Sequence, residues 1–223
     1  MRSGLGAAYR ELGAMADCER ELREVLATAT RLGLSNLRAI ALHNLGAVLA
    51  QRGAFAEGRE AEAEAVAAFV RMRDRRMETG SRNYLARILT QLGDLPAAAE
   101  EARAALAQVG DEREVRIGIL ATVARTDIAL GRPADAVVTA RNAMVLFEAF
   151  GSLEEGESFV RLVWIEALFA AGRRSEARDA AMDARMAVIR RAATISDPTW
   201  QRSFLALPEN VRILALATAW DPR

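Results

Sequence analysis

The 223-residue sequence has little of several features on which whole classes of protein depend. Cys18 is the only cysteine, so an internal disulfide is impossible and a reducing compartment is expected. Thirty basic and thirty acidic residues leave no net charge, which argues against general attraction to nucleic acid or to anionic membranes. Aromatic residues make up only 5% of the chain, a composition that favours close-packed helices over β-sheets.

Long apolar runs are also missing from the sequence. No stretch reaches the length of a membrane span, and residues 1–13 lack the apolar core of a secretory signal. Together with the single cysteine, these absences predict a cytoplasmic protein that does not insert into membranes.

Sequence motifs for catalysis, metal binding and cofactor binding are absent as well. There is no GxxxxGK[ST] phosphate loop and no HExxH or CxxC metal motif. His43 is the only histidine and has no nucleophile at a recognised spacing, so we expect a polar surface or groove residue. Cys18 is expected to be a buried packing thiol. The sequence therefore predicts a protein that is not an enzyme and holds no cofactor or metal.

What the sequence does contain is a repeat. Five glycines recur at separations of 40, 40, 38 and 41 residues: Gly13, Gly53, Gly93, Gly131 and Gly172. The residue five positions after each glycine is Cys, Gly or Ala, and the residue twelve positions after is Ala in all repeats but the first. A period of this length in a fixed register is typical of helical repeat arrays.

The repeat unit is clearest over residues 84–106. Four leucine and isoleucine residues fall on one helical face before the turn: Leu85, Ile88, Leu89 and Leu92. Gly93 can end that helix in the left-handed conformation, Asp94 can cap the next helix, and Pro96 fits its first turn. The second helix has small side chains that allow close approach to the first: Ala98, Ala102 and Ala105.

The pattern predicts an all-α fold, an α-α superhelix of stacked antiparallel helix hairpins. Residues 1–195 are expected to form about four and a half to five repeats, and residues 196–223 a C-terminal capping segment on the last repeat. The first helix is expected to lack its beginning, which suggests a piece of a larger protein; the alternative is a naturally short first helix. The helices are expected at 17–31, 37–52, 55–71, 77–92, 95–109, 112–130, 133–150, 153–171 and 175–193.

The capping segment is marked by two prolines. Ser196-Asp197-Pro198 is a stop-and-cap signal, and Pro208 can open a final helix. An array leaves the apolar face of its last repeat uncovered, so the capping segment is expected to cover that face. Three hydrophobic residues of the last repeat are expected to form core against the terminal helices: Phe159, Leu162 and Phe169. The alternative is that they line a ligand pocket.

Several positions resemble the tetratricopeptide repeat (TPR). One repeat carries the likeness in Leu45, Gly46, Leu49, Gly53, Phe55, Gly58 and Ala65, and the resemblance covers nearly all of residues 5–193. A period near 40 exceeds the usual 34 residues and is similar to the long-helix variety of bacterial signalling ATPases and kinesin light chains. Asp127 and Ile165 depart from the family pattern.

The tail carries a narrower resemblance. The run Trp200-x-x-Ser203-Phe204-Leu205 followed by Pro208-Glu209-Asn210-x-Arg212-x-Leu214 is similar to the end of repeat regions in large bacterial serine/threonine kinases and ATPases, notably those of myxobacteria. This resemblance implies an accessory region of a signalling protein, and one partner that it implies is the kinase or ATPase portion of the same chain.

In the resembled family, the first helix of each pair lines a concave groove. Counting back from the turn glycines places six polar residues there: His43, Asn83, Arg87, Gln91, Arg125 and Glu166. Arg125 comes one repeat after Arg87, so the two guanidinium groups should lie together and suit a carboxylate or an acidic peptide. The alternative is that the arginines are solvated or internally paired, with Glu166 neutralising one of them.

These observations favour a non-catalytic scaffold that binds a protein or peptide, possibly acidic, in the groove. Two other functions stay open at this stage. One is a peptide or small-ligand sensor that changes the pitch of the superhelix and regulates an attached kinase or ATPase domain. The other is homo-oligomerisation through the atypical terminal helix.

Overall fold

The computed structural model describes residues 15–153 and 155–220, and every regular element in this part of the chain is an α-helix. The helices are α2 (Met15–Arg31), α3 (Ser35–Gln51), α4 (Phe55–Met72), α5 (Arg75–Leu92), α6 (Leu95–Gln108), α7 (Arg113–Ala129), α8 (Pro133–Phe150), α9 (Glu157–Ala170), α10 (Arg174–Ala193), α11 (Pro198–Leu205) and α12 (Pro208–Trp220). None of the described helices is long and apolar enough to cross a membrane.

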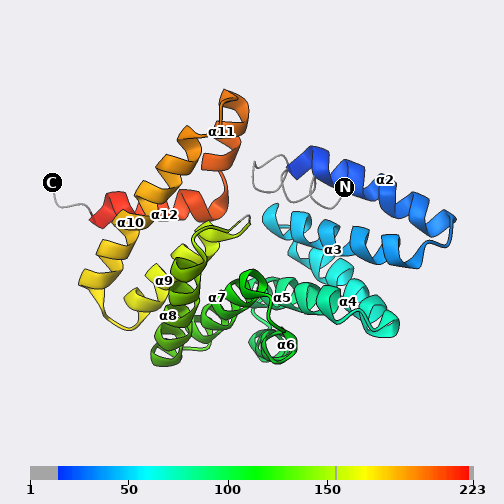
Figure 1. Ribbon diagram of the computed structural model, residues 1–223, viewed down its shortest axis with the longest axis horizontal. Helices are drawn as coiled ribbons and strands as arrows, with labels where there is room; N and C mark the ends of the chain where they lie inside the picture. The colour runs from blue at the N-terminus through cyan, green and yellow to red at the C-terminus, as the bar shows by residue number, and fades with distance from the viewer. Residues whose placement is uncertain (1–14, 154, 221–223) are drawn as a thin grey trace.

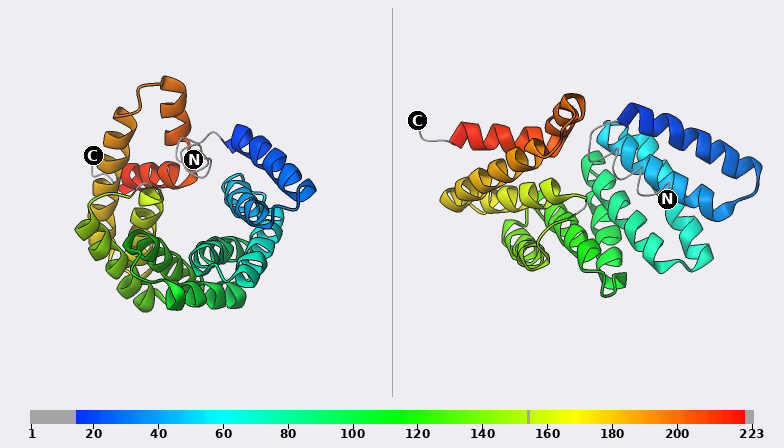
Figure 2. Two further views of the ribbon diagram at one scale, coloured as in Figure 1. Left: turned by 45° about the vertical axis from the view of Figure 1, so that its right-hand side comes forward. Right: turned by 45° about the horizontal axis from the view of Figure 1, so that its top comes forward.

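Successive helices from α2 to α10 pack against one another as antiparallel neighbours and follow a curved path (Figure 1). Within this array, α3, α5, α7 and α9 also contact one another in sequence, so they form an inner row. The left view of Figure 2 shows the array bending round on itself, with α12 turned towards the inside of the curve. The predicted α-α superhelix is therefore confirmed.

The predicted turns lie where the glycines recur. Gly53, Gly93, Gly131 and Gly172 all have φ between 69° and 81°, the left-handed region that glycine adopts without a Cβ clash. Asp94 follows the second of these glycines, and its side chain accepts a hydrogen bond from the backbone N–H of Ala97 at 3.4 Å. The first expected glycine, Gly13, and the helix end before it lie outside the described residues.

The small side chains lie where helices approach each other most closely. Cys18, Ala98, Ala102 and Ala105 are each at most 2% exposed, so the prediction of a buried cysteine is confirmed. Gly58 shows the constraint directly, because a Cβ there would lie 3.1 Å from the carbonyl oxygen of Gly46 on the preceding helix. The repeated small positions thus set the distance between the two helices of a pair.

One helix boundary differs from the predictions by several residues, whereas the capping signal at Asp197 lies where it was expected. The helix expected at residue 153 begins at Glu157, because Gly156 has φ 83° at its N-cap while Leu153, in the preceding loop, is buried in a hydrophobic cluster. The segment after residue 197 forms a separate eight-residue helix, α11, which Asp197 caps by accepting hydrogen bonds from the N–H groups of Thr199 and Trp200. Helix α12 then packs on α10 and α9.

Candidate binding site on the concave face

The inner row of helices surrounds a cavity of about 520 Å³. Its wall is built from the end of α3, the following turn and the first residue of α4, from α5, α7 and α9, and from the first turn of α12. The cavity therefore lies on the concave side of the array, where a repeat protein has its largest continuous surface. Its lining includes four arginines and two glutamates beside aliphatic and aromatic side chains.

Four of the six residues predicted for the groove line this cavity together: Arg87, Gln91, Arg125 and Glu166. The other two, His43 and Asn83, are not part of its wall. They stand on α3 and α5, and His43 belongs to a separate polar cluster. The structure thus brings the two arginines of successive repeats to one place and leaves His43 at another.

Arg87 is held over aromatic rings. Its guanidinium carbon lies 3.9 Å from the ring centre of Phe159 and 5.2 Å from that of Tyr84. A guanidinium stacked on a ring face gains cation–π attraction and keeps its edge available for hydrogen bonding. The acidic partner at that edge is Glu209 of α12, whose Oε1 lies 3.4 Å from an Arg87 nitrogen.

Arg125 faces a carboxylate from the next inner helix. It forms an ion pair with Glu166 of α9, and Glu166 also lies 3.8 Å from the guanidinium of Arg212 on α12. Burial lowers the pKa of Arg125, and the positive charge of Arg87 acts in the same direction, whereas Glu209 opposes the change. The site is therefore crowded with positive charge that its own carboxylates only partly offset.

The alternative prediction, that the groove arginines are internally paired, describes this geometry well. It includes Glu166 as one neutralising group, whereas Glu209 and Arg212 are additional members of the site that the structure places there. The sequence contained a signal for them in the charged residues of the first turn after Pro208. The sequence pattern indicates a capping turn there, and it does not indicate that its charges face the groove.

His43 lies in a buried polar cluster beside the cavity. Its Nδ1 is 3.1 Å from Oε2 of Glu62 and 3.0 Å from Oγ of Ser81, and both of these residues are completely buried. In a serine–histidine–acid triad, the serine and the acid contact opposite ring nitrogens. Here both contact the same nitrogen, so the cluster lacks the geometry of a hydrolytic triad. Within the described residues, no group of three His, Cys, Asp or Glu side chains is placed to hold a metal ion.

The apolar set named in the sequence divides between core and surface. Phe159 and Leu162 are buried and line the cavity, whereas Phe169 is 48% exposed and stacks on Trp220 of α12 with ring centres 5.2 Å apart. Core and pocket are thus not alternatives for Phe159 and Leu162, because both are buried and both line the cavity, where Arg87 stacks on the ring of Phe159.

No protein-family model and no curated protein matches the sequence. Solved structures do share its fold. Two crystal structures from Podosopora anserina, described as a kinesin light chain with nearly identical TPR-like repeats, superpose on the chain with TM-scores of 0.61 and 0.60. The first, a substituted variant, is 21% identical over 82% of this chain and 91% of its own; the second is 20% identical over 87% and 95%. The likeness establishes a TPR-like helical repeat fold.

Proposed function

We propose that the protein is a non-catalytic interaction scaffold whose concave cavity binds an acidic segment of another protein. The observation that carries this proposal is the charge of the cavity wall, where four arginines face two glutamates beside an apolar floor. Guanidinium groups pair with carboxylates through two parallel hydrogen bonds, which gives both strength and orientation. The excess of arginines supports a partner that brings at least one carboxylate.

The apolar floor indicates what should stand next to that carboxylate. Phe159 lies under the guanidinium of Arg87, and Leu162 and Ile88 line the same cavity. A partner segment that alternates acidic and aliphatic residues would place its carboxylates on the guanidinium groups and its aliphatic side chains on this floor. A partner segment with carboxylates alone would leave the apolar side chains of the cavity without a contact.

A synthetic peptide tests the proposal without knowledge of the natural partner. A fluorescein-labelled peptide of alternating glutamate and leucine should bind, as measured by fluorescence anisotropy, and a matched peptide of glutamine and leucine should not. Joint replacement Arg87→Ala and Arg125→Ala should weaken binding roughly tenfold or more, because two charge-assisted contacts are lost. Circular dichroism would verify that the variant is folded.

Arg178→Ala supplies the control, because Arg178 is exposed on α10 and does not line the cavity. It removes one positive charge from the molecule and should leave affinity unchanged. Equal binding of the two peptides, or unchanged affinity in the double variant, would contradict the proposal.

The tail resemblance supports an accessory role in a larger cytoplasmic signalling protein with long-helix repeats, in which the partner segment belongs to an attached kinase or ATPase. A kinase or nucleotide-binding module encoded in the same gene would support this context. Mixing that module with the array should then alter its activity, and an unchanged activity would argue for a partner on another chain.

The cavity also favours a second candidate function, a small-ligand sensor. Its volume of about 520 Å³ falls within the range of small-molecule sites, and its chemistry suits an organic carboxylate with an apolar body. A thermal shift produced by such carboxylates alone, and abolished by Arg87→Ala with Arg125→Ala, would support the sensor over the scaffold.

A further inference from the structure

The terminal helix supplies part of the cavity wall. Pro208, Glu209 and Arg212 of its first turn line the cavity, whereas all other lining residues belong to residues 47–166 of the array. Glu209 reaches Arg87 across 122 residues of sequence. The chain therefore places one of its own carboxylates at the guanidinium group that the proposed function assigns to a partner.

Helix α12 itself is firmly fixed. Ile213 and Ala217 have no exposed surface, and the buried side chain of Asn210 donates a hydrogen bond to the carbonyl oxygen of Phe204 at 2.8 Å. Detaching the helix would expose these apolar side chains and leave the Asn210 amide without its acceptor. Any change at the site must then come from the Glu209 side chain and not from movement of the helix.

The contact between Glu209 and Arg87 is weak enough to exchange. Its 3.4 Å separation is longer than the 2.7–2.9 Å of a strong charge-assisted hydrogen bond. The side chains of Arg87 and Glu209 are 22% and 19% exposed, so solvent and a partner can reach both. Because Arg87 also rests on Phe159, its guanidinium would keep its place after the carboxylate turned away.

The second carboxylate of the site differs from Glu209. Glu166 lies between Arg125 and Arg212 and so has two cationic neighbours, one from α7 and one from α12. Removing Glu166 would take away the ion pair that each of these guanidinium groups makes with it, whereas removing Glu209 would take an ion pair from Arg87 alone. Glu209 has a single ion pair within the described residues, so it is the carboxylate that a ligand can replace.

We infer that Glu209 is an internal competitor, a carboxylate of the chain itself that occupies Arg87 until a partner's carboxylate displaces it. This inference rests on the proposed function and specifies how the same site is regulated. The terminal helix would then set the affinity of the groove, and any change that turned Glu209 away from Arg87 would strengthen binding.

The test measures the affinity of the glutamate–leucine peptide for four proteins: wild type, Glu209→Gln, Arg87→Ala, and the combination of both. Glu209→Gln should raise affinity about fivefold, because a partly exposed ion pair no longer has to be broken. The gain should vanish in the Arg87→Ala background, where the competitor has no target. Glu148→Gln, which removes the same charge from an exposed position of α8, should leave affinity unchanged.

Each outcome decides the inference. A gain that persists in the Arg87→Ala background would show general charge repulsion and overturn the competitor. Binding that needs Arg87 but ignores Glu209→Gln would overturn the competitor and leave the proposed function standing. Absence of binding in both wild type and Glu209→Gln would overturn the proposed function and the inference with it, whereas binding by Glu209→Gln alone would support both.

Discussion

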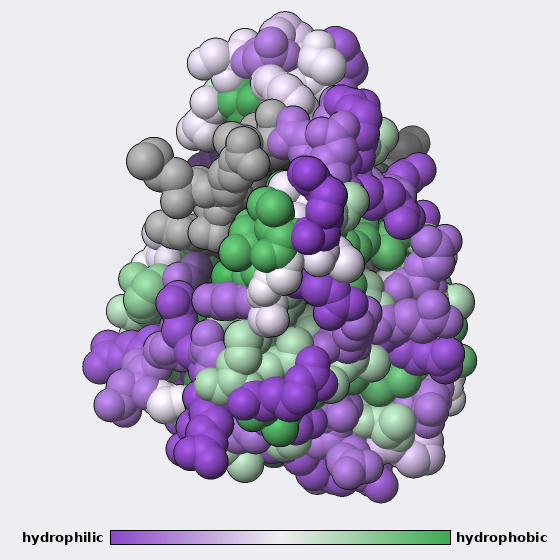
Figure 3. Space-filling model, turned by 90° about the vertical axis from the view of Figure 1, so that its right-hand side faces the viewer, coloured by the Kyte–Doolittle hydropathy of each residue, from purple (hydrophilic) through white to green (hydrophobic). Residues whose placement is uncertain are grey.

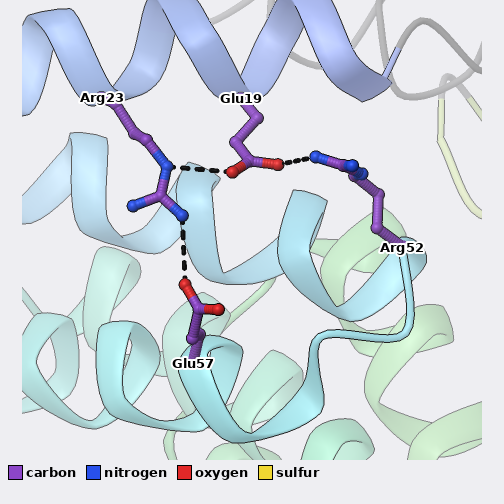
Figure 4. A network of polar contacts seen from close by, with 4 residues as sticks. All are labelled: Glu19, Arg23, Arg52 and Glu57. Atoms are coloured by element: carbon purple, nitrogen blue, oxygen red, sulfur yellow. Dashed lines mark hydrogen bonds and ion pairs between the residues drawn. The ribbon is translucent and has the colours of Figure 1, made fainter.

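Helices α2 and α12 stand at opposite ends of the described array, and different contacts hold them in place. Among the 17 residues of α2, only Cys18 and Ala29 are buried, whereas the 13 residues of α12 bury four: Asn210, Ile213, Leu216 and Ala217. The polar contacts of α2 compensate in part. Figure 4 shows Glu19 between Arg23 and Arg52, with Arg23 also 3.1 Å from Glu57 of α4.

The same contrast extends inward from each end. The two largest hydrophobic clusters lie in the C-terminal half, one among α7, α8 and α9 and the other among α9 to α12. The N-terminal half has smaller clusters and includes the buried polar group of His43, Glu62 and Ser81. Figure 3 views the side on which α2–α4 lie and shows mainly hydrophilic side chains with smaller apolar areas between them.

This difference has a consequence for the concave site. Apolar burial is neither screened by salt nor titrated, whereas exposed ion pairs weaken at high salt and when their carboxylates are protonated. The wall that carries Glu209 is therefore held by apolar burial, whereas α2, which contributes no residue to the cavity, depends more on charges. Met15 at the start of α2 packs at the edge of the C-terminal cluster, and the remaining contacts of α2 among the described residues are with α3 and α4.

The largest effect is expected from Ile213→Ala in α12. Ile213 has no exposed surface and belongs to the C-terminal cluster, so truncation should lower the free energy of unfolding by about 2 to 5 kcal/mol. Urea unfolding followed by circular dichroism would measure the loss. Val211→Ala removes apolar atoms from the same helix at a site 51% exposed and should change stability by less than about 0.5 kcal/mol. Equal losses in the two variants would mean that α12 is not anchored by burial.

A smaller loss is expected from Gly46→Ala in α3. A Cβ at this position would lie 2.6 Å from Cγ of Glu62, and the buried Glu62 side chain would have to give up its place beside His43. Overpacking of this kind should cost about 1 to 3 kcal/mol. Gly118→Ala in α7 is the matched control, since a Cβ there meets nothing within 4 Å and should stabilise the helix by about 0.5 to 1 kcal/mol. Two variants with the same sign of effect would contradict the view that the buried polar cluster around Glu62 leaves no room for a side chain at Gly46.

The sequence predicts those features of the fold and site that depend on residues close together in the chain or at equivalent positions of neighbouring repeats. The turn at Gly93 and Asp94 follows from a left-handed glycine and a capping carboxylate, and the period placed Arg87 and Arg125 in one cavity because equivalent positions of stacked repeats are neighbours. Other features depend on contacts between distant parts of the chain. Leu153 is one example: its apolar side chain suggests the start of a helix, but it lies in a loop that packs into the hydrophobic core.

The pairing of Glu209 with Arg87 could not be predicted for a related reason. The two residues meet only because the accumulated curvature of the repeats brings the last helix back to α5, the second helix of the inner row. A small rotation between successive repeats, summed over the array, decides which residues face each other across the curve. The sequence period specifies that repeats stack but does not specify that angle.

The smallest effect is expected from Glu19→Gln at the weaker end. This change removes the carboxylate that Arg23 and Arg52 share, and an exposed network of this kind should contribute less than about 1 kcal/mol. Hydrogen exchange measured by mass spectrometry should show faster exchange in α2 and no change in α12, because the loss is confined to one end. High salt should produce the same pattern in the wild type. Faster exchange in both helices would mean that the ends are not held independently.

The stability difference between wild type and Glu19→Gln should also depend on pH, in a direction that the pKa of Glu19 determines. The hydrogen bond from Arg23 lowers the pKa of Glu19 below its ordinary value of 4.5; burial opposes the shift, and Arg52 adds to it. A carboxyl group whose pKa is depressed by folding stabilises the protein fully above its unfolded pKa and loses that contribution as the pH falls through the folded pKa. The difference in stability between wild type and Glu19→Gln should therefore be constant above about pH 5 and close at lower pH. A difference that grew on acidification would show that the carboxylate of Glu19 is not what holds α2.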